Sequence, residues 1–140
     1  MFATPEAAEQ AFYEALEQAD TTRLREIWAD DEEIVCIHPG GLRAVGYEAV
    51  HESWQQTLSA GPLRIRPLRP QIVQNMMCSV HTLVEQVVVE VRGVTQYAHC
   101  YATNVYHNGP TGWRMVTHHA SPAPAEANAP EALNARPRLH

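Results

Sequence analysis

The stretch that decides the fold is EEIVCIHPGGLRAVGYEAVHESW, residues 32–54. Its apolar run at 34–37 is typical of a short buried strand. The run stops at His38, and the Pro and Gly residues at 39–41 predict a turn. From 46 to 58 the apolar residues recur at helical spacing. An imidazole therefore lies at the end of a predicted buried strand and next to a rigid turn, so His38 is the first candidate functional residue.

Two further helices are predicted on the amino-terminal side of this stretch. Residues 5–18 carry an apolar stripe at helical spacing, and Thr4 is a suitable N-cap for them. Asp20 is a second cap, and the shorter helix that follows it carries the apolar residues Leu24, Ile27 and Trp28. The acidic residues after this helix are predicted to form a solvated loop before the strand.

The remaining sequence alternates in the manner of β-strands. Extended segments are predicted at 63–77, 79–93, 94–108 and 113–121, and Pro67 and Pro70 mark an edge or a bulge in the first of them. Three helices followed by mostly antiparallel strands predict an α+β fold, in which a strongly curved sheet wraps the helices into a cone with a pocket at its open end. We predict a domain at 1–122, and an Ala/Pro-rich flexible tail at 123–140.

Composition narrows the class of partner and the compartment. The chain has 140 residues and a net charge of −6, and it has no Lys/Arg cluster that favours nucleic acid or an anionic membrane. The amino terminus has no secretory signal pattern, and no apolar run approaches the about 20 residues that span a bilayer. Cys36, Cys78 and Cys100 lie in strand-like contexts and are predicted to be free thiols, which indicates the cytoplasm.

The histidines raise the question of a metal site. The chain has 8 of them, but it lacks the HExxH, Cys-x-x-Cys and His-x-His spacings that hold metals. Phosphate-binding and nucleophile motifs of the types GxGxxG, GxxxxGK and GxSxG are also absent. We therefore expect no metal and no cofactor, although strands can bring His38, His99 and His119 together in space.

Several motifs together resemble the NTF2-like superfamily, and within it the SnoaL-like proteins and the relatives of ketosteroid isomerase. The motifs are AFYEALEQAD, LREIWADDEEIVCIHPGG, VGYEAVHESW, YATNVYHNG and GWRMVTHHASP, and the resemblance covers roughly residues 5–122. The resemblance implies the cone fold, a pocket for a small hydrophobic molecule, and a homodimer through the outer face of the sheet. The apolar residues Val87, Val89 and Val91, or their neighbours, are predicted to lie on that outer face.

The isomerase relatives carry a general base at the end of the first strand, before a Pro, and His38 is at that position here. Their oxyanion tyrosine corresponds to Phe12, beside Tyr13, and their oxyanion aspartate corresponds to Thr103. Phe12 has no hydrogen-bond donor, so the resemblance does not imply steroid isomerase activity. The aromatic partner on the third helix corresponds to Trp54, whose indole N–H can donate.

The resemblance also implies which strand faces point inward. On the last strand it puts His119 and Met115 inward and His118 outward; on the preceding strand it puts His99, Tyr101 and Thr103 inward. The catalytic candidates are therefore His38 and His119. The ligand-binding candidates are Phe12, Trp28, Trp54, His99, Tyr101, Thr103 and Met115. Each has a simpler alternative, namely core packing or a hydrogen bond within the sheet.

Two functions remain open, and whether the protein is an enzyme is undecided. The first is a SnoaL-like isomerase, dehydratase or cyclase that acts on a hydrophobic carbonyl compound by His-based proton transfer. The second is a non-catalytic ligand-binding or self-association module of the same fold. A cavity shared by His38 and His119 favours the first function, and an interior filled by Trp28, Trp54 and Met115 favours the second.

Overall fold

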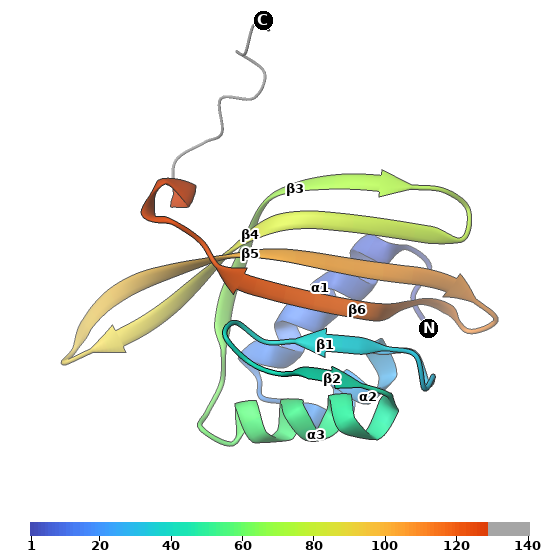
Figure 1. The fold of residues 1–140 in the computed structure, drawn as a ribbon, viewed down its shortest axis with the longest axis horizontal. Helices are drawn as coiled ribbons and strands as arrows, with labels where there is room; N and C mark the ends of the chain where they lie inside the picture. The colour runs from blue at the N-terminus through green and yellow to red at the C-terminus, as the bar shows by residue number, and fades with distance from the viewer. Residues whose placement is uncertain (129–140) are drawn as a thin grey trace, which may run out of the picture.

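The computed structural model describes residues 1–128, and the rest of the predicted tail, 129–140, lies outside the described residues. The helices are α1 (Pro5–Glu17), α2 (Thr21–Ile27) and α3 (Tyr47–Leu58). The strands are β1 (Val35–Ile37), β2 (Arg43–Val45), β3 (Arg64–Gln74), β4 (Cys78–Val91), β5 (Val94–Gly109) and β6 (Gly112–Pro122). A short 3-10 helix, η1 (Ala125–Asn128), follows β6 (Figure 1).

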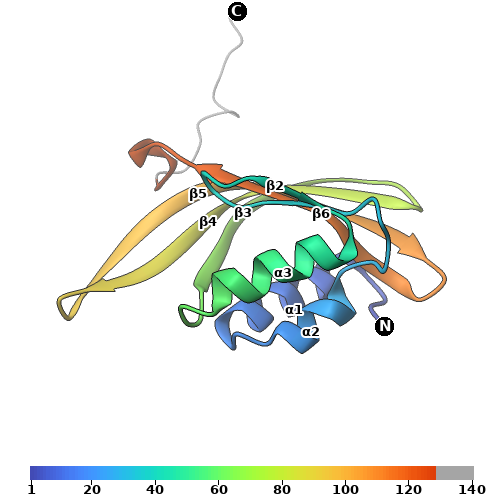
Figure 2. The same ribbon diagram turned by 60° about the horizontal axis from the view of Figure 1, so that its bottom comes forward.

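The strands form one mixed sheet in the order β2-β1-β6-β5-β4-β3. Neighbouring strands run antiparallel, except that β1 runs parallel to β6. Figure 2 shows the three helices together on one side of the arched sheet. The predicted α+β cone is therefore confirmed. The sequence did not reveal β2, because Arg43–Val45 has no apolar run like that of β1 and becomes a strand only by pairing with β1.

The predicted helix caps are present. The Thr4 hydroxyl accepts the N–H of Ala7 at 3.0 Å, and the Asp20 carboxylate accepts the N–H of Arg23 at 2.9 Å. Each cap satisfies an N–H that the first turn of a helix leaves without a partner. Within residues 1–128, none of the helices combines the length and the apolar character needed to cross a membrane.

Large side chains fill the space between the helices and the sheet. Trp28, Trp54, Tyr106 and Met115 are fully or almost fully buried. Trp28 and Met115 also form an isolated β-bridge, which fixes the end of α2 against β6. This packing places the core under the centre of the sheet, and α1, α2 and α3 all lie on the inner side of the sheet.

Two β-bulges interrupt the sheet. The first lies in β3 between Leu68 and Gln71, where the prolines predicted an edge or a bulge. The second lies in β6, because Tyr106 pairs with Met115 while Val105 pairs with Thr117. Val116 is therefore an extra residue, and each residue after it points to the face opposite to the one that strict alternation predicts.

The β4–β5 hairpin extends beyond the rest of the sheet. The last pair between β3 and β4 is Arg64 with Val88, so residues 89–96 form a two-stranded arm that no other strand of residues 1–128 joins (Figures 1 and 2). Strand alternation places Val87, Val89 and Val91 on the same face as the buried Glu85. They therefore lie on the helix-facing side of the sheet, and the expected outer-face position of these three residues is wrong.

The chain after β6 returns over the sheet. The N–H of Ala123 donates to the carbonyl of His99 at 2.9 Å, and Ala127 in η1 is buried. An Nη2–H of Arg69 donates to the Ala127 carbonyl. These contacts fix residues 123–127 beside β5 and the bulge of β3.

Candidate functional site

A network of buried polar side chains lies between α1 and the sheet. Residues four apart on α1 face the same way, as do alternate residues on each strand, so the topology brings these side chains to one place. They are Glu9 and Tyr13 from α1, His81 and Glu85 from β4, Asn104 and Tyr106 from β5, and His118 from β6.

Glu85 is the most perturbed acid of this network. The residue is 3% exposed, and its Oε2 accepts the hydroxyl of Tyr13 at 2.7 Å. Burial raises the pKa of Glu85 to about 7; the Tyr13 hydrogen bond lowers it and the charge of Glu9 raises it further. Near neutral pH, Glu85 therefore exists in both protonation states, as a group that exchanges protons must.

Asn104 determines how the network is protonated. Its Nδ2 donates to the Tyr13 hydroxyl and to Glu9 Oε2, both at 3.0 Å. Because both amide hydrogens are used, its Oδ1 accepts at 2.6 Å from Nδ1–H of His118. Burial lowers the pKa of His118 to about 3. The ring is therefore neutral, and its Nε2 carries a lone pair 4.0 Å from Glu85 Oε2.

The pKa of Glu9 is shifted in the opposite direction to that of Glu85. Its carboxylate accepts from Asn104 and, at 2.8 Å, from the hydroxyl of Tyr106. His81 Nδ1 lies 3.1 Å from Glu9 Oε1, although without hydrogen-bond geometry. Burial alone would raise the pKa of Glu9, but these neighbours outweigh it and lower the pKa. Two nearby carboxyl groups with pKa values moved apart are the usual arrangement for acid–base chemistry.

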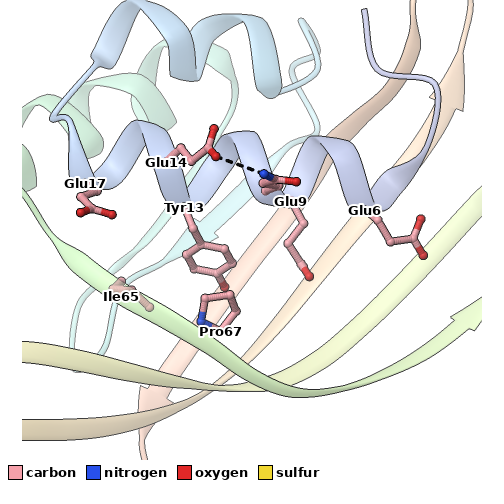
Figure 3. A pocket seen from close by; sticks show the side chains of 8 residues that line it. Glu6, Glu9, Tyr13, Glu14, Glu17, Ile65 and Pro67 are labelled. Carbon is pink, nitrogen blue, oxygen red and sulfur yellow. Dashed lines mark hydrogen bonds between the residues drawn. The ribbon is translucent and has the colours of Figure 1, made fainter.

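One end of the network opens into a pocket between α1 and β3. The pocket has a volume of about 330 Å³. Figure 3 shows Glu9 and Tyr13 directed from α1 towards the sheet, with Ile65 and Pro67 of β3 on the opposite wall. Its other lining residues, all on α1, are Glu6, Gln10, Glu14 and Glu17. The helix wall of this pocket is therefore acidic, and protons can reach the buried network from it through Glu9 and Tyr13.

The structure corrects the predicted faces of the last two strands. Asn104 and His118 are buried, whereas Tyr101 and His119 are exposed and Thr103 is half-buried on the outer face. On β5 the inward-facing set lies one residue from the expected register, so Asn104 faces inward in place of Thr103. On β6 the extra residue Val116 reverses the faces, so His118 faces inward in place of His119.

The same shift of one residue affects α1. Both Phe12 and Tyr13 are buried, but Tyr13 supplies the hydroxyl and Phe12 supplies an aromatic wall. The Phe12 ring lies 5.6 Å from Trp54 and 5.1 Å from His118, measured between centroids. Phe12 lacks a donor, as expected, but the adjacent Tyr13 supplies a buried hydroxyl that donates to Glu85.

His38 and Trp54 lie together beside the network. Nε2 of His38 is 3.2 Å from the Ser53 hydroxyl, and its ring meets the Trp54 ring edge-on at 4.5 Å. Trp54 in turn lies 5.7 Å from His118. Burial lowers the pKa of His38, so its neutral form is favoured. The indole N–H of Trp54 is buried and has no partner among residues 1–128.

The other predicted site residues are separated from this group. Trp28 and Met115 are fully buried in the core. His99 is half-buried on the outer face, where its Nε2 lies 3.3 Å from the Gln86 amide nitrogen. The structure therefore brings Phe12, Trp54 and His38 to the network and leaves His99, Tyr101, Thr103 and His119 outside it.

Sequence reasoning missed Glu85, Asn104 and His118. Glu85 did carry a signal, because it is a lone carboxylate within the apolar run LVEQVVV. A charge at a buried strand position needs partners, so it indicates either a network or a site.

Known proteins of similar sequence and structure place the chain in a family. The SnoaL-like domain family matches residues 6–126. A solved candidate calcium/calmodulin-dependent protein kinase type II association domain from Thiobacillus denitrificans is 33% identical, with a TM-score of 0.81 over 89% of this chain and 98% of that one. A candidate dehydratase of the NTF2-like family from Streptomyces avermitilis is 25% identical, with a TM-score of 0.75 over 87% and 100%. No curated protein matched the chain.

An NTF2-like superfamily protein from Salmonella enterica is 23% identical, with a TM-score of 0.70 over 85% of this chain and 89% of that one, and it supports the fold alone. The family match covers most of the chain. The protein therefore belongs to the SnoaL-like domain family and has the NTF2-like fold.

Proposed function

We propose that this domain binds a small organic molecule and transfers a proton to or from it with Glu85. The observation that carries the proposal is the buried Glu85 carboxyl, which accepts the Tyr13 hydroxyl and whose pKa is raised by burial to about 7. His118 is the neutral partner of Glu85, and Asn104 holds both His118 and Tyr13 in place. Glu85 and His118 take the role predicted for His119, which faces outward, and His38 stays in the proposal as a ligand contact beside Trp54.

The sheet surface beside Glu85 favours a hydrophobic substrate. On β4, Val87 and Val89 share the face of Glu85; on β5, Cys100 is paired with Glu85 and Ala98 with Val87. This apolar surface runs from Glu85 towards the arm, and its outer residues are exposed. A hydrophobic carbonyl compound that lies on it presents an acidic C–H bond to Glu85.

The chemistry is proton removal and return. Ionised Glu85 takes a proton from the carbon next to the carbonyl group, and the resulting enolate recovers a proton at the same or another carbon, as in an isomerisation. Tyr13 links Glu85 to the pocket between α1 and β3, because its hydroxyl donates to Glu85 and the residue lines that pocket, where Glu85 exchanges protons with solvent. General acid–base catalysis of this kind contributes about 10²–10⁴-fold to a rate.

Deuterium uptake tests the proposal with a panel of hydrophobic ketones as candidate substrates. Each ketone is incubated with the protein in D₂O, and its mass is followed. We expect catalysed uptake by at least one ketone, a loss of about 10²-fold or more in Glu85→Gln, and no change in the control His119→Gln. Uptake that is equal in the native protein and Glu85→Gln would refute the role of Glu85.

A second candidate function is self-association without turnover. Three observations favour it: Trp28, Trp54 and Met115 fill the interior, the Thiobacillus relative is a candidate association domain, and the arm exposes Val91 and Val94. An isolated two-stranded ribbon is marginally stable in water, so a second copy packed on the arm would stabilise it. This predicts a homodimer in which the arm contributes to the interface.

Light scattering after gel filtration tests the dimer. We expect a dimer for the native chain and a monomer for Val91→Glu, which puts a charge on the arm. The control is Thr111→Glu, at an exposed position of the turn between β5 and β6, at the end of β5 opposite to the arm, and it should remain a dimer. A native monomer at micromolar concentration contradicts the interface.

The cytoplasm stays the predicted compartment, because Cys36, Cys78 and Cys100 are all free thiols.

A further inference from the structure

Arg69 has an unusual backbone conformation. It lies in the β3 bulge with a φ of 52°, the left-handed region that favours glycine. A side chain other than glycine in this region costs roughly 1–2 kcal/mol. Pro70 follows directly, which further restricts the backbone of Arg69. A strained residue of this kind is kept where its side chain is needed, so the guanidinium group calls for an explanation.

A pocket of about 200 Å³ surrounds Arg69 on the outer face of the sheet. In the strand register Gln71 pairs with Thr82, and Thr82 pairs with Thr103, so these three side chains form one row across the sheet. Tyr101 adds a phenol, and the remaining lining residues are Leu83, Val84 and Ala102. Among the described residues 1–128, the lining contains no carboxylate, although the chain as a whole has a net charge of −6.

The guanidinium group of Arg69 has donors to spare. Its Nη2 donates to the Ala127 carbonyl, and its Nε is buried with no hydrogen-bond partner among residues 1–128. In the same part of the chain, no carboxylate forms an ion pair with it. A buried donor without an acceptor costs about 1–3 kcal/mol, and an acceptor entering the pocket removes that cost. The planar fork of an arginine matches the two oxygens of a carboxylate.

We propose that this outer-face pocket binds a small organic carboxylate. Arg69 provides the positive charge, and the hydroxyls of Tyr101, Thr82 and Thr103 provide neutral hydrogen bonds. Val84, which shares the outer face with Thr82, contacts the apolar part of the ligand. The site lies on the face of the sheet opposite to Glu85, so it is distinct from the proposed proton-transfer site.

A matched pair of probes tests the charge requirement. Benzoate and benzamide have nearly the same shape, but only benzoate carries the carboxylate. Each is titrated into the full chain while the backbone amide signals of Thr82 and Thr103 are followed by NMR. We expect benzoate to shift these signals and to bind at least about tenfold more tightly than benzamide, since charge-assisted bonds to arginine are about twice as strong as neutral ones.

Three variants locate the site. Arg69→Gly suits the positive φ, so it should fold, and it should weaken benzoate binding at least about tenfold. Thr103→Val, which keeps the side-chain shape, should weaken it several-fold. Arg64→Ala, on the same strand but outside the pocket, should change it less than about twofold. Glu85→Gln should leave benzoate binding unchanged, because Glu85 lies on the opposite face of the sheet. A failure of the benzoate test would therefore not count against proton transfer by Glu85.

The outcomes that overturn the proposal are specific. They are equal binding of benzoate and benzamide, native-like benzoate binding by Arg69→Gly, or no shift of the Thr82 and Thr103 signals at saturating benzoate. If a second copy of the chain covers this pocket, benzoate will not shift the Thr82 and Thr103 signals, and that result also counts against the site.

Discussion

Replacing Glu85 by glutamine tests the physical basis of the site through protein stability. The glutamine side chain keeps the shape of the native one and an oxygen that can accept the Tyr13 hydroxyl, but it does not titrate. In the native protein burial raises the pKa of Glu85 from 4.5 to about 7. The folded state therefore binds more protons than the unfolded state between these values, and stability is present below the unfolded pKa and lost as the pH rises through the folded pKa.

The size of the effect follows from linkage. At about 1.36 kcal/mol per pKa unit, ionising Glu85 in the folded protein costs about 3 kcal/mol above neutral pH, and about 2.5 kcal/mol of this appears between about pH 5 and about pH 8. No discount for solvent is needed, because Glu85 is 3% exposed. Raising the pH over this range should therefore make the Glu85→Gln variant more stable relative to the native protein by about 2.5 kcal/mol.

Urea unfolding at the two pH values, followed by the fluorescence of the buried Trp28 and Trp54, measures this difference. Glu90→Gln is the matched control, because Glu90 is an exposed glutamate on the same strand. Its difference from the native protein should change by much less than about 2.5 kcal/mol over this range, because its side chain lies outside the buried network. A stability difference between Glu85→Gln and the native protein that is the same at both pH values would refute the account of Glu85.

Three other predictions address the network and the fold. His118→Gln should become more stable relative to the native protein by about 2 kcal/mol as the pH falls from about 7 to about 5 in urea titrations, because native His118 is neutral in the fold and its contribution to stability is lost as the pH falls below the unfolded pKa. Tyr13→Phe should lower the free energy of unfolding by about 1–3 kcal/mol. It should also raise the pKa of Glu85 further, as measured by NMR, because it removes the hydrogen bond that lowers that pKa. Gly112→Ala should lower the free energy of unfolding, measured by thermal unfolding, by more than about 2 kcal/mol. The reason is that φ is 90° and a Cβ would lie 2.6 Å from the Phe2 carbonyl oxygen. Gly93→Ala, with φ of 78° and open space around it, should lower it by only about 1 kcal/mol. Equal losses for the two glycine variants would contradict the contact with Phe2.

The sequence predicted the elements of the fold well, because caps and periodicity are local properties. Thr4 and Asp20 marked the helix starts, and Pro67 and Pro70 marked the irregular edge strand. The strand β2 was not predicted, because its residues become a strand only through their pairing with β1.

The site was predicted less well, because it depends on which face of a strand points inward. Because Val116 is an extra residue in β6, His118 points inward where His119 was expected. No local pattern in the sequence marks this bulge. The valines of the arm were misplaced for a related reason. Their face is fixed only when Glu85 on the same strand is known to point inward.

The interior network also needed the fold before it could be recognised. Its members are spread from Glu9 to His118, and they meet only when α1 packs on the sheet. Local spacing cannot reveal that convergence.

The most direct test of the account is the titration of the Glu85 carboxyl carbon in protein labelled with ¹³C at glutamate, with Glu85→Gln used to assign the signal. A midpoint of about 7 is the result that the buried network predicts. A midpoint near the ordinary value of 4.5 would show that Glu85 is solvated, and it would remove the basis for proton transfer at this site.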